Sequence, residues 1–177
     1  MKHFLPILPA LILAACGAES DQIDPVDPAE QATPREIHER ILVIDSHLDT
    51  PANLSKADFD IVADNPTQMG QVQVDLPKMQ RGGLDGGFWV IFTPQGPLDE
   101  ASYAAAKQAA LTRSDEIIAM VEAHPDEFEL AYTADDAERI VAEGKRIVFQ
   151  SIENSYPLGT DLTVLEDFYE RGVRLVG

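Results

Sequence analysis

The chain has 177 residues, of which 45% are hydrophobic, and its 31 acidic side chains outnumber its 13 basic ones, for a formal net charge of −18. This length and apolar content suit one ordinary domain with a packed core. The negative charge argues against a nucleic acid partner, because a phosphate backbone is neutralised by Lys and Arg side chains. It is otherwise typical of a well-solvated surface.

Residues 1–15 have the pattern of a signal peptide. Met1-Lys2-His3 is a short positive start, and residues 4–15 form an apolar run. This run is shorter than the ~20 residues that a membrane-spanning helix needs, and it suits a secretory signal. The alternative interpretation is a buried N-terminal helix with an incidental cysteine.

The only cysteine of the chain follows this run, in Leu13-Ala14-Ala15-Cys16. The tetrapeptide resembles the bacterial lipobox, in which the cysteine is acylated and becomes the first residue of the mature protein. A single cysteine forms no internal disulfide, so we interpret Cys16 as a lipidation site. Residues 16–33 are rich in Ala, Asp, Glu, Gln and Pro without apolar periodicity and predict a flexible tether. Gly17 stands where an Asp would favour the inner membrane, so the expected location is the cell envelope, on the outer membrane and facing the periplasm.

The remaining residues, 34–177, predict a folded domain of alternating helices and strands. Thr33-Pro34 is a typical helix start, and the helix is expected to reach residue 40. Residues 41–45 predict a strand that is buried on both faces, and residues 88–92 predict a second one. A long helix is expected over about residues 99–123, where Ala, Leu, Ile and Met recur at helical spacing.

The alternation continues to the end of the sequence. Thr133 opens a helix to about residue 143 with a capping-box pattern, and residues 146–152 predict a third buried strand. Asp161 is expected to cap a helix that ends near residue 170, and residues 173–176 begin a fourth strand. This order predicts an α/β fold with a parallel sheet. Four strands, the last without a covering helix, are fewer than a βα barrel or a doubly wound sheet contains, so we expect a fragment.

Two strand ends carry residues suited to metal chemistry. His47 and Asp49 follow the first strand in an His-x-Asp pattern and point the same way, because side chains alternate along a strand. Glu153 follows the third strand, so all three belong at the same rim of the sheet. Imidazole and carboxylate groups are good Zn²⁺ ligands, and one carboxylate can bridge two metal ions. The alternative is that these are ordinary solvent-exposed residues at strand ends.

Four stretches of the chain, in order, resemble the renal (membrane) dipeptidase family of zinc-dependent dipeptidases. Residues 44–51, IDSHLDTP, resemble the opening signature IDGHNDLP, and residues 75–89 resemble DLPRLREGGVGAQFW. Ser151-Ile152-Glu153 falls where the family has a bridging glutamate, and residues 165–174 resemble LRAFYDLGVRYL.

The resemblance implies a TIM-like (βα)8 barrel of the metal-dependent hydrolase type, of which this chain would be about the first half. It implies that His47 and Asp49 bind one zinc and that Glu153 bridges two zinc ions in the complete chain. The remaining ligands and the general base would lie beyond Gly177, so no catalytic residue is assigned and activity of the 177 residues alone is doubtful. Ser46, Leu48, Asn154 and Ser155 depart from the family pattern and leave substrate choice open.

Other residues that could take part match no family motif or have a simpler explanation. His3 lies in the signal segment, and His38 and His124 are expected on helix surfaces. Phe88 and Trp89 are expected in the core, with a place at the pocket mouth as the alternative. Asp45 is either a plain strand-end carboxylate or a hydrogen-bond acceptor that orients His47.

The expected function is zinc-dependent hydrolysis of dipeptides by a metal-activated water. The alternatives are another metal-dependent amidohydrolase on the same barrel, because such barrels host many reactions, and a non-catalytic envelope lipoprotein. The expected partners are a dipeptide substrate, a membrane through the lipid anchor, and a second copy of the chain if the protein is a homodimer.

Overall fold

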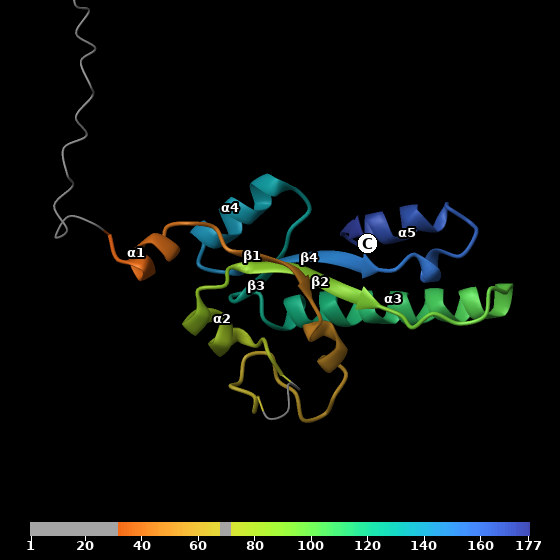
Figure 1. The fold of residues 1–177 in the computed structure, drawn as a ribbon, viewed down its shortest axis with the longest axis horizontal. Helices are drawn as coiled ribbons and strands as arrows, with labels where there is room; N and C mark the ends of the chain where they lie inside the picture. The colour runs from red at the N-terminus through yellow and green to blue at the C-terminus, as the bar shows by residue number, and fades with distance from the viewer. Residues whose placement is uncertain (1–31, 68–71) are drawn as a thin grey trace, which may run out of the picture. The chain divides into compact units, whose positions relative to one another are not determined.

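A computed structural model of the chain describes residues 32–67 and 72–177, which form one five-stranded sheet and the helices around it. The signal segment with His3, Cys16 and the tether up to residue 31 lie outside the described residues. The elements in chain order, shown in Figure 1, are α1 (Pro34–His38), β1 (Ile44–Leu48), the 3-10 helix η1 (Thr50–Asn53), α2 (Leu76–Gly82), β2 (Gly86–Phe92), α3 (Glu100–Ala123), β3 (Phe128–Leu130), α4 (Ala134–Ala142), β4 (Arg146–Glu153), the 3-10 helix η3 (Tyr156–Leu158), α5 (Val164–Glu170) and β5 (Val173–Val176).

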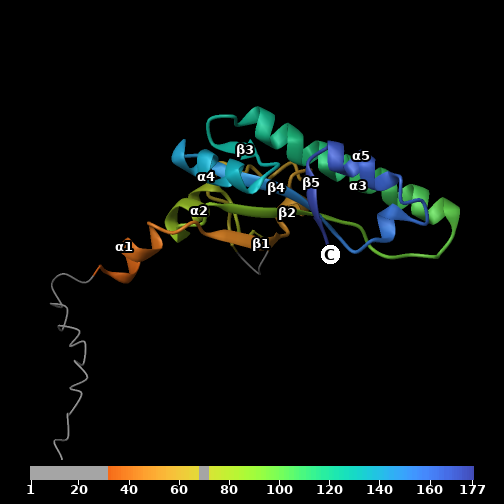
Figure 2. The same ribbon diagram turned by 90° about the horizontal axis from the view of Figure 1, so that it is seen from above.

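All strand pairs in the sheet are parallel, as the alternating pattern predicted. The strand order is β1-β2-β4-β3, and β5 also pairs with β4, beyond the part of β4 that pairs with β3. Figure 2 shows β1 at the edge of the sheet away from α3. A parallel sheet with its connecting helices is the architecture of part of a βα barrel, so the expected α/β fold class is confirmed.

The sequence of β2 determines how closely its neighbours can approach. A Cβ atom on Gly86 would lie 2.3 Å from the carbonyl oxygen of Ile147, and one on Gly87 would lie 2.2 Å from that of Asp45. Gly86 also has a φ of 148°, which side-chain-bearing residues rarely adopt. The two glycines therefore let β2 pair with β1 on one side and β4 on the other.

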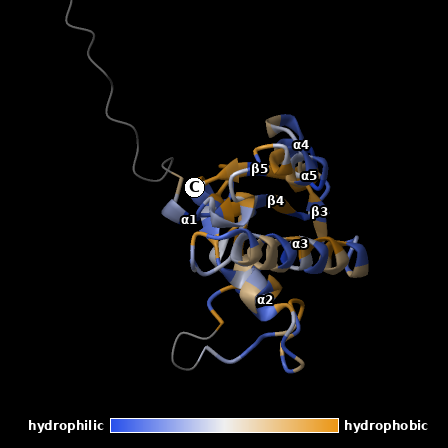
Figure 3. Cartoon of the chain, turned by 90° about the vertical axis from the view of Figure 1, so that its right-hand side faces the viewer, coloured by the Kyte–Doolittle hydropathy of each residue, from blue (hydrophilic) through white to orange (hydrophobic). Residues whose placement is uncertain are grey.

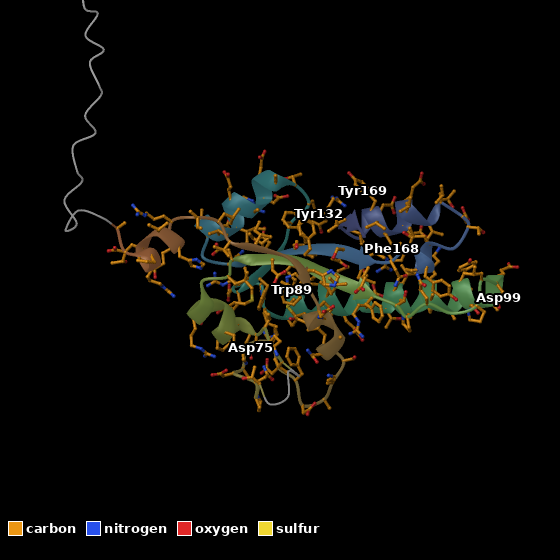
Figure 4. All side chains as sticks on the ribbon, in the orientation of Figure 1. Asp75, Trp89, Asp99, Tyr132, Phe168 and Tyr169 are labelled. Carbon is orange, nitrogen blue, oxygen red and sulfur yellow. The ribbon has the colours of Figure 1, made fainter. Side chains whose placement is uncertain are left out.

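The main core lies between the sheet and α2, α3 and α5. Trp89 and Ile152 from the strands pack with Ile117 of α3 and Phe168 of α5, and all four side chains are buried. Figure 4 shows Trp89 within the sheet, and in Figure 3 hydrophobic residues gather in β4 and β5. Trp89 packs edge-on against Phe128 and donates a hydrogen bond to the Ile147 carbonyl, so its expected place in the core is confirmed. Among the described residues, no helix is both long and apolar enough to cross a lipid bilayer.

A buried polar link joins α3 to β4 inside this core. The Ser114 hydroxyl donates to Gln150 Oε1 at 2.8 Å, and Gln150 Nε2 donates to the Arg171 carbonyl at 2.7 Å. Both side chains are fully buried, so these bonds satisfy groups that would otherwise be costly to bury. They also tie β4 to α3 and to the end of α5, three residues before β4 ends at Glu153.

Most helix boundaries agree with the expectations. Thr33 and Thr133 cap α1 and α4 in capping boxes, and Asp99 caps α3. The last helix begins later than expected, at Val164, because Asp161 accepts hydrogen bonds from Thr163 and forms a turn before the helix. Helix α2 and strand β3 were not predicted, so the sheet has five strands where four were expected.

The expectation that the first strand is buried on both faces was wrong. The strand starts at Ile44, three residues later than expected, and Ile41 and Leu42 are 55% and 43% exposed. The reason is that β1 lies at the edge of the described sheet and pairs with β2 alone. Within β1 only Leu48, at its end, is buried.

Asp75, labelled in Figure 4, anchors the segment between η1 and β2 and is fully buried. Its carboxylate accepts hydrogen bonds from the backbone N–H of Lys78 at 3.0 Å and of Asn65 at 2.9 Å, and it forms an ion pair with the Lys78 ammonium. Burial raises the pKa of Asp75, but the hydrogen bonds from Lys78 and Asn65 outweigh it and hold the pKa below its usual value.

Replacing Asp75 by Ala should destabilise the full-length protein by about 2–4 kcal/mol, the sum of a lost helix cap and of buried donors left without partners. The matched control is Asp99→Ala, which removes the cap of α3 at an exposed position and should cost less. The free energies of unfolding come from urea titrations. Equal losses in the two variants would contradict the anchoring role of Asp75.

The acid stability of the protein should depend on the same carboxylate. A pKa that is lower in the folded chain means that ionised Asp75 stabilises the fold above about pH 3.9, the usual value for an unfolded chain, and that this stabilisation is lost as the pH falls through the folded-state value. The Asp75→Asn variant has no such proton to gain. Its free energy of unfolding should therefore decrease less steeply than that of the wild type between pH 5 and pH 3, and parallel curves would refute this.

Candidate metal centre

His47, Asp49 and Glu153 meet at the carboxyl end of the sheet, where the sequence placed them. The Nε2 atom of His47 lies 3.5 Å from Asp49 Oδ1 and 3.3 Å from Glu153 Oε2. One possible ligand atom from each residue lies within 4.8 Å of the others, and no second group of three or more His, Cys, Asp or Glu side chains in the described part is so arranged.

These residues come from strands that are not neighbours. His47 lies on β1, Asp49 follows it, and Glu153 is the last residue of β4, with β2 in between. Neighbouring strands are about 4.8 Å apart, so the backbones of β1 and β4 are separated by about twice that distance. The imidazole and the glutamate side chain must both reach over the end of β2 to meet.

Each ligand candidate is held by its local backbone. The backbone N–H of His47 donates to Asp45 Oδ1 at 2.8 Å, so Asp45 supports the strand end and its carboxylate bonds to the backbone of His47 instead of to the imidazole. The carbonyl of Pro51, two residues after Asp49, accepts a hydrogen bond from Arg113 of α3. Glu153 is paired with Phe92 in the last step of the β2–β4 ladder.

The arrangement suits a divalent metal ion. In a tetrahedral zinc site with bonds of about 2.1 Å, neighbouring ligand atoms are about 3.4 Å apart, close to the two distances from His47. One imidazole and two carboxylates are also a donor set that zinc accepts. Without a cation, Asp49 and Glu153 place two negative charges close together, which is unfavourable unless a positive charge lies between them. The side chains remain 40% to 75% exposed, so an ion has access from solvent.

A cleft of about 390 Å³ adjoins the β1 side of this cluster. Its wall includes His47 and Asp49, residues of η1, and the segment before α2. The volume falls within the range of small-molecule sites.

Phe92 is a residue at this rim that sequence reasoning missed. It ends β2 beside Glu153 and is 51% exposed, unlike Trp89. Phe88, the other aromatic considered for the pocket mouth, stacks on Phe149 with ring centroids 5.0 Å apart. Phe92 could have been identified from its position as the last apolar residue of a predicted strand. The carboxyl ends of the strands form the rim where barrel sites are built.

The remaining histidines in the described part lie apart from the cluster. The Nε2 atom of His38 is 3.1 Å and 3.2 Å from the carbonyl oxygens of Gly82 and Gly83, which ties α1 to the end of α2. His124 follows α3 and lines a separate cleft with Glu116 and Met120. Both side chains are partly buried, and both lie on or at the end of a helix, as expected.

The chain was compared with known protein families, curated proteins and solved structures. Residues 31–177 match the membrane dipeptidase family, peptidase family M19. The chain is 30% identical to dipeptidase tcpJ of Claviceps purpurea over 131 residues, which are 70% of this chain and 31% of that protein. The chain thus spans about a third of the length of the curated relatives it matches.

Solved structures agree with this match. The probable dipeptidase PvdM of Pseudomonas aeruginosa is 33% identical, with a TM-score of 0.70 over 81% of this chain and 36% of that one. A metallopeptidase of Rhodobacter sphaeroides, solved with a phosphinate mimic of the dipeptide L-Ala-D-Ala, is 25% identical, with a TM-score of 0.63 over 77% of this chain and 45% of that one. The family match covers most of the sequence and includes both strands that carry the cluster, so the chain belongs to the membrane dipeptidase family.

Proposed function

We propose that the protein is a zinc-dependent dipeptidase and that His47, Asp49 and Glu153 are metal ligands. The observation that carries this proposal is the meeting of one imidazole and two carboxylates at the carboxyl end of the sheet, from strands on either side of β2. Membership of the membrane dipeptidase family supports it.

In this proposal His47 and Asp49 would hold one zinc ion, and Glu153, which has two carboxylate oxygens, would contribute to two. Zinc supplies a Lewis acid that polarises a peptide carbonyl and lowers the pKa of a water molecule. His47 would bind through Nε2, the atom that faces Asp49 and Glu153, which would leave its proton on Nδ1. The negative charges of Asp49 and Glu153 offset the charge of the metal ions. No general base is assigned among the described residues.

The chain's own residues also suggest how a small substrate is held. The exposed ring of Phe92 offers an apolar contact next to Glu153, and the cleft beside His47 and Asp49 offers space. The Rhodobacter sphaeroides relative was solved with a mimic of L-Ala-D-Ala. We therefore propose dipeptides as the substrate class, including those with a D-residue at the carboxyl end.

We also propose that the enzyme is exported and anchored by lipid. The support is the sequence alone: an apolar signal segment followed by Leu13-Ala14-Ala15-Cys16 and a tether of polar residues. An outer-membrane anchor would hold the catalytic domain in the periplasm, where it would meet peptides from outside the cell or from cell-wall turnover.

The metal proposal predicts a loss of zinc when a ligand is changed. In the full-length protein, which should hold about two zinc ions by the two-metal arrangement of the family, His47→Ala and Glu153→Gln should each lower zinc content. Each should also reduce kcat/KM for L,L- and L,D-dipeptides by more than about 100-fold, above the usual effect of outer-sphere changes. Since both side chains are about half exposed, metal-free stability should change by only about 0.5 kcal/mol.

Matched controls are His124→Ala and Glu138→Gln, which change the same residue types away from the cluster. Zinc is measured by elemental analysis, and stability by urea unfolding in a chelator. If Glu153→Gln kept wild-type zinc content and turnover, its assignment as a ligand would be refuted.

The anchor proposal predicts that Cys16→Ala remains unprocessed or unlipidated in the native host, as intact-mass spectrometry would reveal. A second variant, Gly17→Asp, should still be lipidated but should move to the inner-membrane fraction. Normal cleavage at another site with no lipid on Cys16 in the wild type would refute the proposal.

A further inference from the structure

The turn that follows Glu153 has an unusual backbone. Asn154 has a φ of 55°, and it is the only non-glycine residue with positive φ among those that the structure describes. The left-handed region costs most side-chain-bearing residues energy, although Asn tolerates it better than others. Such a residue persists where the surrounding structure holds it in place, and this often happens at functional sites.

The side chain of Asn154 supplies that support on both sides of the turn. Its Nδ2 donates to the carbonyl oxygen of Thr93 at 2.9 Å, and its Oδ1 accepts from the backbone N–H of Tyr156 at 3.0 Å. The β2–β4 ladder ends at the pair Phe92 and Glu153. Thr93 and Asn154 are therefore the first residues beyond it, and the amide of Asn154 continues the connection between the strands where backbone pairing stops.

Glu153 stands directly before this turn. Its carboxylate must cross the end of β2 to reach 3.3 Å from His47, so a small rotation of the β4 terminus moves it out of reach. We propose that Asn154 is a positioning residue: its two amide hydrogen bonds hold the end of β4 against β2 so that the Glu153 carboxylate faces His47. This rests on the proposed role of Glu153 as a metal ligand.

A second contact anchors the same loop further along. The Tyr156 hydroxyl donates to the Pro97 carbonyl at 2.7 Å, and its ring packs against Tyr103 with centroids 5.2 Å apart. These contacts do not involve Asn154 Nδ2. A change at Asn154 should therefore leave the loop folded and loosen mainly the residue that precedes it.

The test compares zinc affinity in the full-length protein and in Asn154→Gly. Glycine adopts the left-handed turn without strain but cannot make the two hydrogen bonds of the Asn154 side chain. The variant therefore removes these hydrogen bonds while the backbone can keep its conformation. We expect the dissociation constant for zinc, measured by competition with a chromophoric chelator, to rise about 10- to 100-fold, as for other groups that orient a metal ligand. The visible spectrum of the Co²⁺-substituted variant should also change. An unchanged zinc dissociation constant overturns the proposal.

Asn154→Asp gives an independent arm that does not depend on how well the glycine variant folds. The added negative charge by itself would tighten zinc binding, whereas loss of the donor to the Thr93 carbonyl should weaken it. Weaker binding supports the positioning role, and equal or tighter binding contradicts it.

Asn65→Ala is the matched control for a purely structural effect. The amide of Asn65 is buried, whereas Asn154 is partly buried, and it too bridges a loop, donating to the carbonyls of Asp60 and Ala63. Its loss should lower the thermal unfolding temperature of the metal-free protein without changing zinc affinity. Loss of zinc in Glu153→Gln with normal affinity in Asn154→Gly would refute this inference alone, whereas retained zinc in Glu153→Gln would refute the metal proposal itself.

Discussion

The reach of His47 and Glu153 across the end of β2 is the contact on which the candidate metal centre depends. Two strands that flank a third cannot bring ordinary side chains together if the sheet is flat, because about 10 Å separates their backbones. The contact requires long side chains and a sheet that curls toward the site, as parallel sheets do when they form barrels. The candidate metal centre thus depends on how the sheet curves as much as on the three side chains themselves.

The helix side of the sheet is closely packed next to the candidate site. Ile91 of β2 and Ile152 of β4, the residues immediately before the rim, are buried in the same core cluster as Ile117 of α3. Gly86 and Gly87 leave no side chain between the strands at the opposite end. A change in the volume of a close-packed core residue shifts the residues around it. Core side chains that do not contact His47, Asp49 or Glu153 therefore help to position the rim.

The sequence predicted the elements with strong local signals. Thr33, Asp99 and Thr133 cap the helices where expected, and the apolar runs in β2 and β4 are buried strands. Strand β3, with three residues, and helix α2, with seven, are too short to show a period. The start of β1 was misplaced because Ile41 and Leu42 are apolar but exposed, and hydrophobicity alone does not show where backbone pairing begins.

The candidate site was predictable in part, because its residues follow strands that the sequence predicted. A strand followed by His-x-Asp and a strand ending in Glu identified His47, Asp49 and Glu153, because the carboxyl ends of parallel strands share one rim. The order β1-β2-β4 and the left-handed turn at Asn154 could not be foreseen, since both depend on residues distant in sequence. Phe92 was overlooked because its last position in an apolar run looks like that of any core residue.

The parallel pairing of β1, β2 and β4 also has a kinetic consequence. His47 and Glu153 are more than one hundred residues apart in the sequence, and contacts of this kind form only after long loops have closed. We therefore expect the three ligand candidates to come together late in folding, after the helices and the strand ladder that carry them. A cation that binds this cluster recognises the finished fold, so it should slow unfolding while leaving the rate of folding almost unchanged.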